Sequence, residues 1–206
     1  MQYLYMLFGA FFAPVIHEWT RAVTSTVLGD PTPRNNGFKT FNPIKFSEPI
    51  GFILTLVFGF GWGRPIPISY AYYKNRKQGV LLVNILPSVV NLLIGIIAIL
   101  IARTIDIPLS QWGFNNGTTG IAGGIFWSIF FFGSFNVGIA IFNLIPVYPL
   151  DMQKILLYFS SPTTIQHITH YEKPMQIVLI VLLVFGLMNY ILVPIRDGII
   201  FLIPSL

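Results

Sequence analysis

Residues Gly79–Ala102 have the sequence GVLLVNILPSVVNLLIGIIAILIA, an apolar run that contains no charged residue. A helix needs about 20 mostly apolar residues to cross a bilayer, so this run predicts a transmembrane helix. Three further stretches are long enough to cross: Tyr3–Leu28, Ile121–Val147 and Met175–Ile195. The sequence therefore predicts an all-α polytopic membrane protein with four long transmembrane helices.

The composition agrees with a membrane protein. The chain has 206 residues, of which 54% are hydrophobic and 9% charged, whereas soluble domains carry about 25% charged residues. A disordered chain and a charged coiled coil are excluded. The absence of cysteine excludes disulfides, thiolate metal sites and cysteine nucleophiles. No internal repeat or low-complexity linker divides the sequence, so we expect one domain over residues 1–206.

A fifth apolar segment, Ile50–Trp62, is too short to be a typical span. Runs of this length are more often re-entrant or interfacial than spanning, and this one contains three glycines. We therefore expect a short re-entrant helix here. The tail Ile199–Leu206 is too short to cross alone and predicts at most a short C-terminal membrane segment.

The basic residues predict an orientation. If Ile50–Trp62 turns back, nine basic residues share one side of the membrane and only Arg103 and Arg196 face the other. This asymmetry favours basic loops in the cytoplasm and the N-terminus outside. The net charge of +5 therefore indicates membrane topology and contact with the lipid bilayer, not nucleic acid. The nine are Arg34, Lys39, Lys45, Arg64, Lys74, Arg76, Lys77, Lys154 and Lys173.

The few charges that do not lie in predicted loops predict a buried cluster. Glu18 and Arg21 lie beside His17 within the first span, and Asp151 follows the third long span after two prolines. Charge inside a membrane costs about 2.5–3.5 kcal/mol per residue on insertion scales and usually marks function or pairing. The first and third long spans run in the same direction if Ile50–Trp62 is re-entrant. Their four polar side chains are then expected to meet at one depth.

The spacing of His17, Glu18 and Arg21 resembles that of a metal-binding motif. In the sequence His17-Glu-Trp-Thr-Arg21, positions 17 and 21 lie one helical turn apart on one face. With histidine at both ends, this would be the H-E-x-x-H motif, in which two imidazoles bind zinc and the glutamate activates water. Here Arg21 replaces the second histidine.

Further short motifs follow in order along the chain, and together they resemble one family. The matching elements are Ile16-His17-Glu18, Gly29-Asp30-Pro31-Thr32, Asn42-Pro43, Glu48-Pro49-Ile50-Gly51, Gly61-Trp62-Gly63-Arg64-Pro65-Ile66-Pro67, Asn91, and Asn143-Leu144-Ile145-Pro146 through Pro149-Leu150-Asp151. The chain resembles the site-2 protease family of intramembrane zinc metalloproteases, in its compact bacterial form.

The resemblance implies roles for particular residues. It implies zinc as cofactor, with His17 and Asp151 as metal ligands and Glu18 as the catalytic base. It also implies a bacterial plasma-membrane location, a membrane-inserted hairpin after the re-entrant helix, and a partner's transmembrane segment as substrate. Interhelical hydrogen bonding is an equally open role for the two asparagines among the substrate-lining residues. Those implied lining residues are Trp62, Arg64, Pro65, Pro67, Asn91 and Asn143.

The departures from the family pattern change the functional prediction. Arginine has no lone pair to donate and stays protonated, so Arg21 cannot bind zinc. We expect Arg21 to pair with Glu18 and Asp151. A second departure is Met152, which stands where glycine usually follows the aspartate in the family. The chain is therefore predicted to be a site-2-protease-like homologue with impaired or lost catalysis. Two alternatives stay open: an active protease with a substituted ligand, and a small transporter or channel subunit that uses the buried charges as a relay.

Overall fold

The computed structural model describes residues 2–111 and 120–203, and within these ranges the chain is helical and contains no β-strand. The α-helices of the described ranges are α1 (Gln2–Val27), α2 (Thr32–Asn35), α3 (Pro49–Phe58), α4 (Arg76–Gln111), α5 (Gly120–Phe142), α6 (Asp151–Tyr158), α7 (Pro162–His170), α8 (Glu172–Val184) and α9 (Asn189–Leu202). Two single 3-10 turns, η1 (Pro43–Phe46) and η2 (Tyr70–Tyr72), lie in the connections.

Fewer helices can cross a membrane than the four that the sequence predicted. Among the described residues, α4 and α5 are long and apolar enough, and α8 with α9 makes a third if this bent pair is one span. The predicted span Met175–Ile195 is not one continuous helix, because the run bends near Gly186 (φ +72°), where α8 and α9 meet at 71°. The first predicted span forms α1, but its polar stretch His17–Arg21 lowers the hydropathy of that helix.

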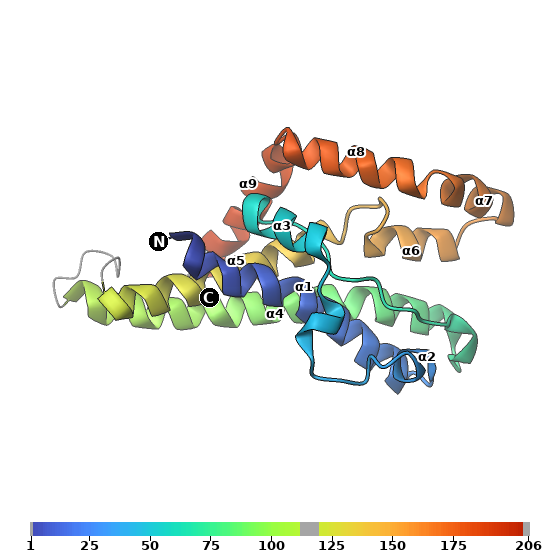
Figure 1. Cartoon of the computed structure of the whole chain (residues 1–206), viewed down its shortest axis with the longest axis horizontal. Helices are drawn as coiled ribbons and strands as arrows, with labels where there is room; N and C mark the ends of the chain where they lie inside the picture. The colour runs from blue at the N-terminus through green and yellow to red at the C-terminus, as the bar shows by residue number, and fades with distance from the viewer. Residues whose placement is uncertain (1, 112–119, 204–206) are drawn as a thin grey trace.

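The centre of the molecule is a layer of three helices. α4 and α5 run side by side over most of their lengths, and α1 packs against both of them (Figure 1). Small residues let these backbones approach closely, as is typical of helix pairs in membranes. A Cβ added to Gly95 of α4 would lie 2.9 Å from the Gly133 carbonyl oxygen of α5. These contacts fix the positions of the polar residues of α1.

The short apolar segment forms α3 and then an extended chain. The Glu48 side chain caps α3 by accepting from the Gly51 amide at 2.5 Å, and the helix ends at Gly59 with φ +81°. Residues 60–69 are extended, but within the described residues they do not pair as strands. The predicted short helix is therefore present. The predicted hairpin is an extended segment, since it makes no β-ladder.

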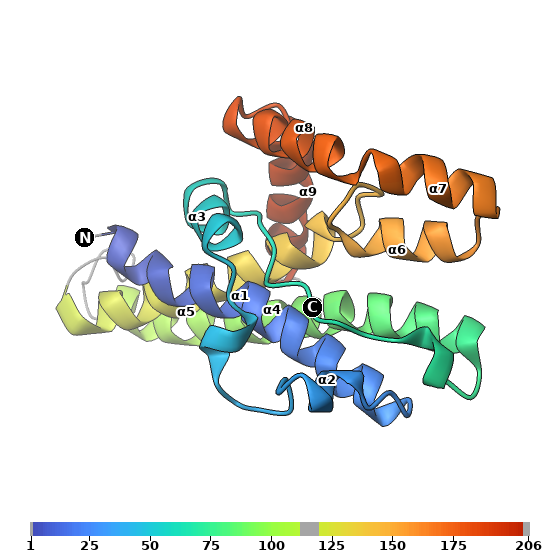
Figure 2. The same ribbon diagram turned by 45° about the vertical axis from the view of Figure 1, so that its right-hand side comes forward.

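The C-terminal third forms an arm beside the central layer. α6, α7 and α8 follow one another around a bend at one end of the molecule, and α9 returns toward α5 (Figure 2). Residues 199–202 belong to α9, so the predicted C-terminal segment is no separate element. Its last three residues, 204–206, lie outside the described residues.

Candidate functional site

The predicted site combines side chains from α1 and α6. His17, Glu18 and Arg21 lie within about one turn of α1 and are buried. The chain leaves α5 after Phe142 and turns through residues 143–150 before α6 begins at Asp151. The Met152 amide donates to the Asn143 carbonyl oxygen at 3.1 Å and fixes this turn. Asp151 is thereby directed back toward α1.

Arg21 contacts all three of the other polar side chains. Its Nη2 donates to Asp151 Oδ1 and lies 3.3 Å from His17 Nε2. Its Nε lies 3.3 Å from Glu18 Oε2, which is within ion-pair distance although neither atom makes a hydrogen bond in the described structure. His17 Nε2 is 2.8 Å from Asp151 Oδ2. The four residues therefore form one buried cluster, as the sequence predicted.

Lys154 is a fifth member that sequence reasoning missed. Its Nζ lies 3.1 Å from Asp151 Oδ1, the oxygen that also accepts from Arg21, and its side chain is 27% exposed. Two cations thus face the two carboxylates of Glu18 and Asp151, and their formal charges balance. The signal was available, because residues three apart on a helix are neighbours. As one of the nine basic residues on the predicted cytoplasmic side, this lysine was expected only to mark topology.

The donor set does not fit zinc. A zinc ion would lie about 2.0–2.2 Å from each ligand, which keeps two ligand atoms of a tetrahedral site more than about 3 Å apart. The predicted ligands His17 and Asp151 are hydrogen-bonded directly at 2.8 Å. The Arg21 guanidinium, at the position where the H-E-x-x-H motif has its second histidine, donates to Asp151. Within residues 2–111 and 120–203, no group of three or more His, Cys, Asp or Glu could hold a metal ion. This arrangement stabilises charge without a metal.

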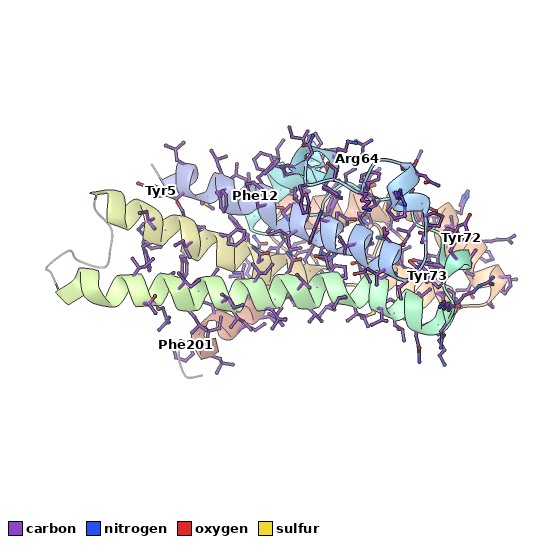
Figure 3. The ribbon with its side chains drawn as sticks, turned by 90° about the horizontal axis from the view of Figure 1, so that it is seen from below. Tyr5, Phe12, Arg64, Tyr72, Tyr73 and Phe201 are labelled. Atoms are coloured by element: carbon purple, nitrogen blue, oxygen red, sulfur yellow. The ribbon has the colours of Figure 1, made fainter. Side chains whose placement is uncertain are left out.

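The residues expected to line a substrate separate into buried and exposed groups. Trp62 is buried in an apolar core cluster, where its ring stacks on Phe142 at a centroid distance of 6.5 Å. Arg64, Pro65 and Pro67 are exposed along the extended segment. Figure 3 shows Arg64 at the outer edge of the molecule.

The two asparagines make hydrogen bonds to backbone or to neighbouring helices. Asn91 Nδ2 donates to the Ala13 carbonyl of α1 and to Asn136 Oδ1 of α5, both at 2.9 Å. Asn143 Nδ2 donates to the Ile139 carbonyl of its own helix at 2.9 Å. For Asn91, the interhelical hydrogen bonding that the sequence analysis considered is present. Its partner Asn136 was not among the predicted residues.

A second buried carboxylate, Asp30, joins the end of α1 to the extended segment. It accepts hydrogen bonds from Ser25 Oγ at 2.8 Å, the Thr32 amide at 2.9 Å and the Ser69 amide at 2.7 Å. Burial raises the pKa of Asp30, but these hydrogen bonds lower it by more, so the pKa lies below its ordinary value of 3.8. Burial raises the pKa of the neighbouring Tyr73 to about 12. Asp30 therefore holds the far end of the extended segment in place.

Comparison with known proteins identifies a relative. No family model and no solved structure matches the chain. The chain is 33% identical over 186 residues to a Bacillus subtilis (strain 168) protein described as "Putative zinc metalloprotease YwhC". The match covers 89% of this chain and 81% of that relative. The chain therefore belongs to the zinc metalloprotease family that this relative represents.

Proposed function

We propose that the chain is a membrane-embedded, site-2-protease-like protein in which a guanidinium replaces the metal, and that it binds the transmembrane segment of a partner without efficient hydrolysis. The observation that carries this proposal is the position of Arg21, which donates to Asp151 and lies beside His17 and Glu18. The metalloprotease relative and the apolar helices α4 and α5 support the membrane-protease ancestry.

The cluster is poorly suited to peptide hydrolysis. A glutamate base in this type of site needs a water that a metal has activated, and the third ligand position here is a fixed cation. Glu18 Oε2 lies 3.3 Å from Arg21 Nε, so its negative charge already has a counter-ion. Arg21 is 1% exposed and would repel a divalent cation at close range. Loss of catalysis follows from this pairing.

The extended segment 60–69 is the surface best suited to a partner. A Cβ added to Gly63 would lie 2.6 Å from Glu18 Cγ, so the segment passes directly over the cluster. Trp62 anchors it in the core, and Arg64, Pro65 and Pro67 face outward. An unwound partner segment that adds to an exposed extended edge gains main-chain hydrogen bonds. In this proposal the basic loops and the partner-binding edge face the cytoplasm, and the N-terminus faces outward.

A cleavage assay tests the proposed loss of catalysis. The wild-type chain, Glu18→Gln and Arg21→His are reconstituted with fluorogenic transmembrane peptides and zinc. We expect wild type and Glu18→Gln to give the same background rate. Cleavage by wild type that Glu18→Gln abolishes would refute the proposal and establish an active protease. Arg21→His reports whether the pocket accepts a metal ligand once the guanidinium is removed.

A crosslinking assay tests partner binding separately. A photo-crosslinker at Arg64 is compared with one at Arg103, an exposed arginine in the C-terminal part of α4, far along the chain from the extended segment. We expect transmembrane peptides to crosslink at position 64 and not at position 103. Equal labelling at both positions would contradict the proposed partner-binding edge.

A further inference from the structure

The connection between α2 and α3 exposes two large apolar side chains. Phe41 is 90% exposed and Ile44 is 70% exposed. Apolar side chains that protrude together usually mark a contact with a membrane or another protein. Neither residue belongs to the cluster around Asp151 or to the extended segment 60–69.

This connection folds back along α1. The Trp19 and Phe41 rings have centroids 6.0 Å apart, and the buried Phe46 packs with Val15 and Ala22 of α1. Trp19 precedes the last residue of α1, Val27, by eight residues, which corresponds to about 12 Å along a helix. Phe41 is therefore held beside α1 at a level well inside the end of that helix.

The charges around the two apolar residues are basic. Lys39 and Lys45 flank them and are exposed, and Lys45 Nζ donates to the Gly37 carbonyl at 3.0 Å. The acidic residue nearest in sequence, Glu48, is engaged as the cap of α3. The surface therefore presents apolar side chains between two cations, which is complementary to an anionic lipid interface.

The helix that follows this connection, α3, also exposes apolar side chains. Three residues on one face of this helix have side chains more than half exposed, and their spacing is three and four residues. That spacing places them on a single stripe. They are Ile50, Ile53 and Val57.

We propose that residues 38–46 form an interfacial anchor for an anionic lipid leaflet. Phe41 and Ile44 insert between the headgroups and the acyl chains, beside Trp19, while Lys39 and Lys45 extend to lipid phosphates. The anchor sets the depth at which α3 enters the bilayer. The anchor does not depend on zinc binding or on proteolysis, so its test is independent of the tests of the proposed function.

Single-cysteine labelling tests the anchor, because the chain has no cysteine of its own. Phe41→Cys, Ile44→Cys and the control Asn35→Cys, an exposed residue of α2, are labelled with an environment-sensitive fluorophore. The full chain is placed in nanodiscs of phosphatidylglycerol and phosphatidylcholine that carry nitroxide-labelled lipid. We expect short-wavelength emission and strong quenching at positions 41 and 44, with water-like emission and weak quenching at position 35.

Charge reversal tests the preference for anionic lipid. In Lys39→Glu/Lys45→Glu, with the label at position 41, quenching in phosphatidylglycerol nanodiscs should fall to the level seen in phosphatidylcholine alone. Water-like emission at positions 41 and 44 would overturn the anchor and indicate a solvated loop, and short-wavelength emission with weak quenching would overturn it and indicate a protein contact. Quenching that is unaffected by lipid charge and by the two reversals would overturn the anionic specificity.

Discussion

Replacement of Arg21 by methionine removes the cation at the centre of the buried cluster and keeps an apolar side chain of similar reach. The side chains of Arg21 and Asp151 are 2% and 3% exposed, so solvent screens their interaction little. After the change Asp151 retains Lys154, but Glu18 loses the one cation within ion-pair distance in the described residues. Removing one partner of a buried ion pair costs about 3–5 kcal/mol, and we expect the free energy of unfolding to fall by this amount.

Unfolding by titration with sodium dodecyl sulfate, in a mild detergent, measures this loss. The matched control is Arg103→Met, an exposed arginine of α4, which should change stability by no more than about 0.5 kcal/mol. Removing both charges in Arg21→Met/Asp151→Asn should cost less than the sum of the single changes, with a coupling of about 1–3 kcal/mol. A loss below about 1 kcal/mol for Arg21→Met would refute the view that the guanidinium stabilises the cluster.

Three further changes test other parts of the structure. In Gly51→Ala the new methyl would lie 1.9 Å from the Trp62 carbonyl oxygen, so thermal unfolding should show a loss of at least about 1–3 kcal/mol; Gly198→Ala, with open space around it, should show none. Trp62→Ala should cost about 3–5 kcal/mol in the same assay, and a small loss would contradict its place in the core. Asp30→Asn should cost about 1.5–3 kcal/mol at pH 7 through weaker hydrogen bonds. Because the folded pKa of Asp30 is lowered, its contribution is present above pH 3.8 and disappears as the pH falls through the folded pKa. The melting temperatures of wild type and Asp30→Asn, measured from pH 7 to pH 3, should therefore converge as the pH falls. A constant difference over this range would contradict a stabilising role for the ionised Asp30 carboxylate.

The central cluster could be predicted because polar residues are rare inside apolar runs. His17, Glu18, Arg21 and Asp151 had few other partners, and burial required them to meet. Lys154 was missed because a lysine near a predicted membrane boundary has an ordinary role in topology. Its contact with Asp151 depends on α6 beginning at Asp151 itself, and element boundaries are the least certain part of a sequence prediction.

The path of the chain outside α4 and α5 was less predictable. The run Met175–Ile195 is mostly apolar, and a sequence of this kind does not specify that α8 and α9 meet at 71°. The bend reflects the packing of α9 on α5, a tertiary contact. In the same way, the family resemblance implied a hairpin after α3, whereas the segment is held by Phe46, Asp30 and core contacts of Trp62.

The zinc content of the purified chain shows whether Arg21 excludes the metal from the buried cluster. Wild type and Asp151→Ala are prepared without chelators, equilibrated with zinc and washed. Elemental mass spectrometry then measures the zinc bound per chain. Because the cation of Arg21 stands where the H-E-x-x-H motif has its second histidine and donates to Asp151, we expect far less than one zinc per chain in both proteins. Close to one zinc per chain in wild type, lost in Asp151→Ala, would show that the cluster is a zinc site despite Arg21.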